Sequence, residues 1–193
     1  MDKKIDVHIS AWFFLFAAIL IMLLPIYWVA AVLFAALIHE IFHALAVLCL
    51  GGRIDCIYVG GRGAVLMTEP MSGIRESICA LAGPLGSFLL ILLSKWFPRL
   101  AVCGLIHGLY NLLPLFPLDG GRILRGILFS AFSPPAASKI YHLSQCVLLI
   151  LLCIFAVTLT LKIGAIPLLF LVFLLLKTRE GKSSCKDARL AVQ

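Results

Sequence analysis

Residues 27–50 read YWVAAVLFAALIHEIFHALAVLCL, an apolar run that is interrupted only by His39, Glu40 and His43. At about 1.5 Å per residue, a helix of this length crosses the roughly 30 Å hydrocarbon core of a bilayer. Ionisable residues in such a helix are unfavourable unless they have partners, and they mark functional sites by default. The run therefore predicts a membrane-spanning helix that carries a functional site.

The composition of the whole chain agrees with a membrane setting. Hydrophobic residues make up 63% of the 193 residues and charged residues only 13%, against about 25% charged in a soluble domain. We expect an all-α multi-pass protein of the lipid bilayer, folded as one domain over residues 1–193. The net charge of +7 comes from basic residues dispersed between apolar segments. Membrane topology explains that dispersal better than nucleic-acid binding, so no nucleic-acid partner is expected.

Charge-free stretches predict about six transmembrane helices. They lie near residues 9–24, 27–50, 76–95, 100–118, 143–161 and 163–177. The first and last are shorter than the usual span, so a re-entrant or tilted hairpin is the alternative at either end. A cleaved signal peptide is a second alternative for the first, although no clear cleavage site follows it.

The positions of Lys and Arg predict the orientation of these spans. With six crossings, 13 basic residues fall on the side that holds both termini, and only Lys95, Arg99 and Lys162 fall on the other. Basic residues concentrate on the cytoplasmic side of membrane proteins. Both termini, including a short tail at 178–193, are therefore expected in the cytoplasm.

The segment between the second and third predicted spans has a different pattern. Residues 53–59 and 64–69 are rich in Ile, Val and Tyr, and Gly60, Gly61 and Gly63 lie between them. This pattern favours a small β-hairpin with a glycine turn. An irregular cytoplasmic loop explains the segment equally well.

His39 and His43 are spaced for metal binding. On a helix they lie one turn apart, so their imidazoles project from the same face and can ligate one zinc ion. Glu40 lies beside them, where it can accept a proton from a metal-bound water. A catalytic zinc site normally has three protein ligands, so one ligand must come from elsewhere in the chain.

Asp119 is the acidic residue that meets this requirement, because it is the only other one at the end of an apolar span. Pro114 and Pro117 must interrupt helical hydrogen bonding just before it, and an unwound segment in a membrane needs protein or water around it. In the six-span topology Asp119 and the two histidines lie at similar depth. The alternative is that Asp119 only caps a helix that begins at Gly120.

Three motifs in this order resemble those of the site-2 protease family of intramembrane zinc metalloproteases. They are LIHEIFHA at 37–44, AGPLG at 82–86 and NLLPLFPLDGG at 111–121. Together they cover the second to fourth predicted spans. Within the family, the chain is similar to the compact branch that contains the stage IV sporulation protease FB, which has six spans and processes a membrane-associated sigma-factor precursor.

The resemblance implies a role for each matching residue. His39, His43 and Asp119 would be the ligands of Zn²⁺, Glu40 the general base, and Asn111 a group that holds the substrate or the developing oxyanion. The family also implies that the hairpin receives the substrate as an added strand. Gly83, Gly86 and Ser87 are expected to allow close helix packing, and His107 is expected outside the ligand set.

The implied function is hydrolysis of a peptide bond in or near the membrane segment of a membrane-associated protein, of which a sigma-factor precursor is one example. The implied location is a bacterial cell membrane, with regulatory membrane proteins as further partners. A membrane metal transporter could also use intramembrane His, Glu and Asp, but we detect no internal repeat of the kind that transporters usually have. A catalytically silent membrane scaffold is the third reading, and it gives no reason for a complete HExxH pattern with a third carboxylate.

Overall fold

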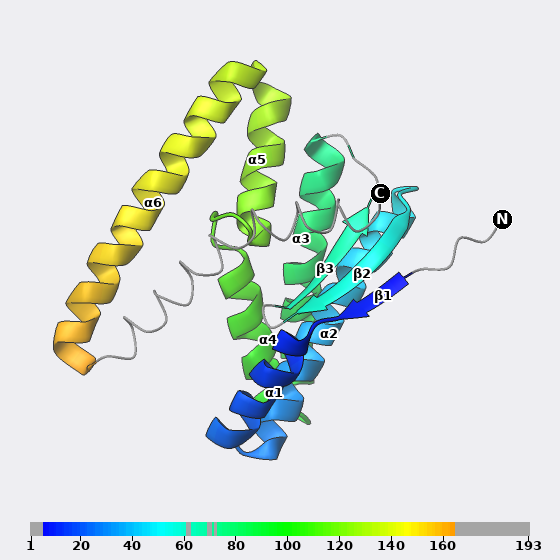
Figure 1. The fold of residues 1–193 in the computed structure, drawn as a ribbon, viewed down its shortest axis with the longest axis vertical. Coiled ribbons are helices and arrows are strands. Elements are labelled where there is room, and N and C mark those ends of the chain that lie inside the picture. Colours follow the sequence, from blue (N-terminus) through cyan, green and yellow to red (C-terminus); the bar gives the residue numbers. More distant parts are fainter. Residues whose placement is uncertain (1–5, 61–62, 69–70, 72, 165–193) are drawn as a thin grey trace.

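A computed structural model describes residues 6–60, 63–68, 71 and 73–164 of this chain. The fold is mostly helical, as predicted (Figure 1). Its helices are α1 (Ala11–Leu23), α2 (Ile26–Cys49), α3 (Gly73–Leu89), the short 3-10 helix η1 (Leu90–Leu93), α4 (Pro98–Asn111), α5 (Asp119–Ala131) and α6 (Pro134–Ile163). Its strands are β1 (Asp6–Ile9), β2 (Ile54–Gly60) and β3 (Gly63–Thr68).

Helix α2 forms from the apolar run at residues 27–50. It follows Pro25, whose fixed φ suits the residue before a helix, and it continues for 24 residues to Cys49. At about 1.5 Å per residue it is long enough to cross a bilayer. The predicted span at 27–50 is therefore confirmed as a helix.

The described residues contain three helices that are long and apolar enough to cross a membrane, namely Ile26–Cys49, Gly73–Leu93 and Pro134–Lys162. The predicted count of six spans is thus not confirmed. Helix α1 has 13 residues, and the predicted span at 163–177 lies largely outside the described residues. Helix α6 begins nine residues before the predicted span at 143–161, because its first turns carry polar residues that a hydropathy criterion rejects.

The predicted span at 100–118 is helical only as far as Asn111, and the interruption predicted at Pro114 and Pro117 is confirmed. Helix α4 ends at Asn111, and residues 112–118 form a loop, which we call the 112–118 loop, before α5 begins at Asp119. Pro114 and Pro117 lie in this loop, as their missing N–H groups require. Figure 1 shows α4 and α5 following one another in the same direction, so the pair forms an interrupted helical segment.

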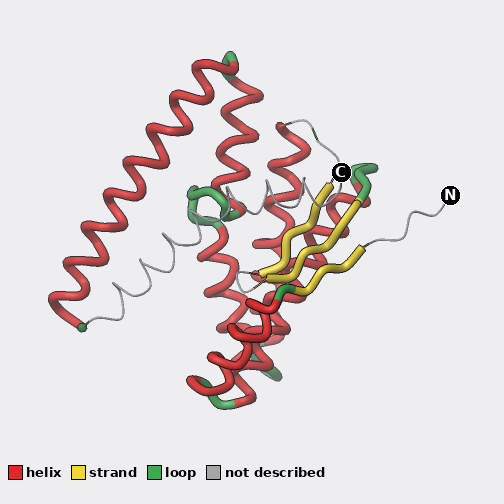
Figure 2. The backbone as a smooth tube through the Cα atoms, in the orientation of Figure 1, coloured by secondary structure: helices red, strands yellow, loops and turns green. Residues whose placement is uncertain are grey.

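The small sheet confirms the hairpin and adds a strand that the sequence analysis missed. Strands β2 and β3 pair antiparallel, with Gly60 opposite Gly63 at the turn. Strand β1 pairs with β2 in parallel, which gives the order β1-β2-β3 among the described residues (Figure 2). A four-residue strand that pairs with a segment about 50 residues away leaves no turn signal in the sequence.

Helices α2, α3, α4 and α5 pack around the centre of the molecule. One cluster of their buried residues consists of Ala31 and Ala35 of α2, Leu90 of η1 and Cys103 of α4. Three of these four side chains are small, which lets helix backbones approach closely in a membrane protein. At Gly104 of α4 a Cβ would lie 2.6 Å from the carbonyl oxygen of Ser87 on α3. This close packing brings α2, α3 and α5 together at one level.

Candidate metal centre

His39 and His43 project from the same face of α2, as the spacing predicted. Both are buried, with exposed fractions of 2% and 6%. Their Nε2 atoms lie 3.1 Å apart, and their rings meet edge to face. Two imidazole nitrogens therefore point at one location beside an apolar helix.

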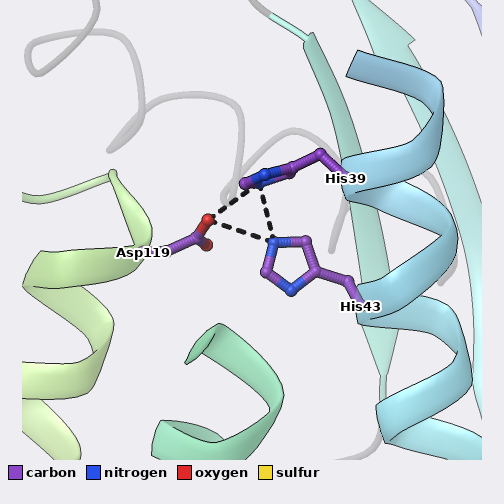
Figure 3. A group of neighbouring side chains, drawn as sticks. All are labelled: His39, His43 and Asp119. Carbon is purple, nitrogen blue, oxygen red and sulfur yellow. Dashed lines mark hydrogen bonds and ion pairs between the residues drawn. The ribbon is translucent and has the colours of Figure 1, made fainter. Parts of the chain in front are cut away.

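Asp119 completes the group from the first turn of α5 (Figure 3). Its Oδ2 atom lies 2.9 Å from Nε2 of His39 and 3.1 Å from Nε2 of His43, and its exposed fraction is 6%. The sequence separation is 80 and 76 residues. The structure thus brings together the three residues that the sequence analysis selected as metal ligands.

The two glycines after Asp119 let the 112–118 loop fold back over the start of α5. A Cβ on Gly121 would lie 2.6 Å from the carbonyl oxygen of Leu115, and one on Gly120 would collide with the carbonyl group of Leu112. Any larger residue would push the loop away from the helix. The glycines therefore determine where the Asp119 carboxylate lies.

The arrangement fits a zinc ion. Ligands bound at about 2.0–2.1 Å in a tetrahedral site lie about 3.3 Å apart, and the three ligand atoms here are separated by 2.9–3.1 Å. Gly83 of α3 also fits such a site. A Cβ at this position would meet Nε2 of both histidines, so the glycine keeps the space beside the ligand atoms clear. Two imidazoles and one carboxylate form a ligand set typical of catalytic zinc, which keeps its fourth position for water or substrate.

Partners on α3 orient the two imidazoles. Nδ1 of His43 lies 2.7 Å from the carbonyl oxygen of Cys79, and because a carbonyl can only accept, this Nδ1–H is the donor. Nε2 of His43 then presents its lone pair to the ligand group. Nδ1 of His39 is hydrogen-bonded to Oγ of Ser87 at 2.9 Å. Such outer contacts fix the tautomer and the ring orientation of metal-binding histidines.

Glu40 and Asn111 were also predicted as site residues. Glu40 is half-buried and follows His39 on α2, but the possible metal-binding group contains only the two histidines and Asp119. Asn111 is buried at the end of α4, where its Nδ2 donates a hydrogen bond of 3.1 Å to the carbonyl oxygen of His107. Their catalytic roles remain predictions.

Sequence reasoning missed several residues around the centre. Gly83 and Gly86 allow close packing as expected, but Ser87 also contacts His39 directly. The ring of His107 stands edge to face with that of His39, with centroids 4.6 Å apart. Arg122 lies 3.8 Å from Oδ1 of Asp119. The contact of Arg122 could have been predicted from its three-residue spacing to Asp119 on one helix. The contacts of Ser87 and His107 with His39 join different helices and leave no such spacing in the sequence.

Comparisons with known proteins agree with this geometry. Residues 67–155 match the family model described as Peptidase family M50. A zinc metalloprotease of Methanocaldococcus jannaschii is 32% identical over 161 residues, which cover 72% of this chain and 47% of the relative. A putative zinc metalloprotease of Synechocystis sp. is 32% identical over 117 residues, 52% of this chain and 31% of the relative. The chain thus spans about half the length of the first of these relatives, and less of the second.

A solved structure matches over nearly the whole chain. The site-2 protease from Methanocaldococcus jannaschii superposes with a TM-score of 0.63 and 27% sequence identity, over 90% of this chain and 89% of that one. The sequence match and the structural match thus point to the same family. On this basis the chain is similar in sequence to peptidase family M50 and in fold to a site-2 protease.

Proposed function

We propose that this protein is an intramembrane zinc metalloprotease that hydrolyses a peptide bond in or near the membrane segment of a protein substrate. The observation that carries the proposal is the convergence of His39, His43 and Asp119 among apolar helices, with their ligand atoms 2.9–3.1 Å apart. The match to the family model and the names of the relatives support the same activity.

The chain's own residues account for the steps that surround the metal. Zinc held by His39, His43 and Asp119 would supply a Lewis acid for the attacking water and the scissile carbonyl. Glu40 would accept the proton of the attacking water and deliver it to the nitrogen of the leaving amine. Asn111 would hold the substrate with its side-chain amide. One N–H of its Nδ2 is directed to the carbonyl of His107, and an amide has a second N–H and an acceptor oxygen.

The sheet suggests how an extended substrate could bind. A helical substrate hides its carbonyl groups in backbone hydrogen bonds and must be extended before cleavage. Strand β2 is paired on both sides, so an added strand would have to join at β1 or β3. Strand β3 contacts α2, the helix that carries His39 and His43, which makes its edge the one that we propose for the substrate.

The finer identity of the substrate rests on the resemblance to the sporulation branch. We propose a membrane-associated protein of the sigma-factor precursor type, cleaved in a bacterial cell membrane, with other membrane proteins regulating access. Both termini are proposed to lie in the cytoplasm. The single-domain organisation of residues 1–193 belongs to the same proposal.

The test of the activity is the Glu40→Gln variant. Glutamine keeps the side-chain shape but cannot accept the proton, so cleavage should fall by at least roughly 10²-fold while zinc content is unchanged. The measurement compares membrane-anchored peptides from cells that express the parent or the variant, together with zinc analysis of both purified proteins. Cys146→Ala, at an exposed position on α6, serves as the control.

Three results would overturn the proposal. Cleavage by the Glu40→Gln protein at a rate near that of the parent would remove the hydrolytic mechanism. Zinc uptake into vesicles that contain the parent protein, without any cleaved peptide, would instead identify a transporter. Absence of both cleavage and uptake would leave the membrane scaffold as the function.

A further inference from the structure

Helix α6 has few points of attachment to the rest of the described chain. It packs mainly along α5, and only 6% of its most apolar stretch is buried. Figure 1 shows α6 extending away from the other helices over much of its length. Among the described residues, α6 makes polar contact with the 112–118 loop, the segment that leads to Asp119.

That contact is made by the side-chain amide of Gln145. Its Nε2 donates a hydrogen bond of 2.7 Å to the carbonyl oxygen of Pro114, and its Oε1 accepts one of 2.9 Å from the N–H of Phe116. One amide thus satisfies a backbone acceptor and a backbone donor two residues apart, as a neighbouring strand would. If the amide were reversed, its N–H would face the N–H of Phe116 and its oxygen would face the oxygen of Pro114. The two hydrogen bonds therefore define the orientation of the Gln145 amide.

Apolar packing holds the Gln145 amide against the 112–118 loop. Leu115 and Leu118 of the loop, each 2% exposed, form a buried cluster against which Leu148 and Leu152 of α6 pack. These two leucines follow Gln145 by one and two helical turns, so they share its face of α6. The loop is therefore held on α6 by a hydrogen-bonded end and an apolar end.

The attachment lies close to the metal centre along the chain. Phe116 precedes Asp119 by three residues, and Leu118 N–H donates to the carbonyl of Leu115 at 2.8 Å. Arg122 N–H in turn donates to the carbonyl of Leu118 at 3.2 Å. A shift of the loop at Phe116 would therefore be passed to the first turn of α5 and to its carboxylate.

We propose that Gln145 is a positioning residue, which holds the 112–118 loop so that Asp119 meets the two histidines as the third metal ligand. This inference rests on the zinc centre of the proposed function. It assigns to α6 a part in building the site, although α6 contributes no ligand. Loss of the Gln145 amide should weaken zinc binding while leaving the histidine pair on α2 in place.

The test uses the purified full chain in detergent micelles and three variants. Gln145→Met keeps the length of the side chain and removes both hydrogen bonds. Gln145→Glu keeps an acceptor for Phe116 N–H and removes the donor to Pro114. Cys146→Ala is the matched control, because Cys146 is an exposed neighbour on the same helix.

Two quantities are measured, zinc affinity by competition with a chelator and amide hydrogen exchange of peptides that cover residues 112–118. We expect about tenfold weaker zinc binding for Gln145→Met, the lower end of the range for outer partners of metal ligands, with faster exchange of the loop. Gln145→Glu should show both effects to a smaller extent, and it provides the test if the Met variant does not fold. Cys146→Ala should match the parent in both.

Each other outcome would overturn the inference. Faster loop exchange in Gln145→Met with zinc affinity within twofold of the parent would show that the loop is held by Gln145 without effect on Asp119. Unchanged loop exchange would show that the amide does not hold the loop. If the parent itself binds no zinc, the proposed metal centre fails as well, and this is visible before any variant is compared.

Discussion

Gly83 of α3 packs so closely against His39 of α2 that a Cβ at position 83 would lie 2.7 Å from Nε2, the atom that faces Asp119. The same Cβ would lie even closer to Nε2 of His43. Real Cβ atoms essentially never approach other atoms below 3.0 Å. The absence of a side chain at this position is therefore a requirement of the metal centre as well as of helix packing.

Substitution of Gly83 by alanine should consequently disrupt metal binding. The added methyl group must displace both imidazoles or separate α3 from α2, so we expect zinc affinity to fall by roughly 100-fold, the upper end of the range for disturbance around metal ligands. Zinc content of the purified Gly83→Ala protein after dialysis measures this. Leu85→Ala, which shortens an exposed side chain on the same helix, should retain its zinc. Full zinc content in Gly83→Ala would show that this contact does not limit the site.

Ser87 provides a milder test of the same centre. Its hydroxyl is fully buried and hydrogen-bonded to Nδ1 of His39 at 2.9 Å, so Ser87→Ala should leave the ring less well oriented. We expect about tenfold weaker zinc binding, measured by chelator competition. In the control Ser130→Ala, the lost hydrogen bond runs to Gly126 within α5. Equal affinities of the two variants would argue against an orienting role for Ser87.

The cluster of His39, His43 and Asp119 could be predicted from the sequence because each of the three residues has a local signal. His39 and His43 are four residues apart, so they share a face of any helix that contains both. Asp119 follows two prolines that forced the interruption seen at the 112–118 loop. The orienting partners could not be predicted in the same way. Ser87 meets His39 across 48 residues, and Gln145 meets Phe116 across 29, through packing that leaves no periodic pattern.

The secondary-structure elements divide in the same way, between those with a local sequence signal and those that depend on distant contacts. The hairpin carried its own glycine turn and was predicted, whereas β1 pairs with β2 across the whole of α1 and α2. Hydropathy found the apolar part of α6 but not its polar first turns, which are stabilised as a helix by Pro at the start and by packing of Ala137 and Tyr141 on Leu128. Contacts made in three dimensions thus set the ends of these elements.

The pairing of β1 with β2 places two predicted loop regions on the same side of the membrane. Strand β1 precedes α1 and β2 follows α2, so their contact puts the chain before α1 on the same side as the chain after α2. Figure 1 shows the start of α3 and the junction of α5 with α6 toward one end of the molecule, and the start of α2 and the end of α6 toward the other. The first end carries Arg75, Arg125 and Lys139, and under the positive-inside rule we predict that it is cytoplasmic.

Cysteine labelling in intact cells measures this orientation. In a background without other reactive cysteines, Trp96→Cys and Phe132→Cys introduce thiols at exposed positions before α4 and between α5 and α6, respectively. A membrane-impermeant maleimide should label Trp96→Cys from outside, and it should reach Phe132→Cys only after the membrane is permeabilised. An epitope added after Gln193 should be reached by its antibody only after the membrane is permeabilised, if both termini are cytoplasmic. The reverse labelling pattern would place the sheet, and with it the edge proposed for the substrate, outside the cell.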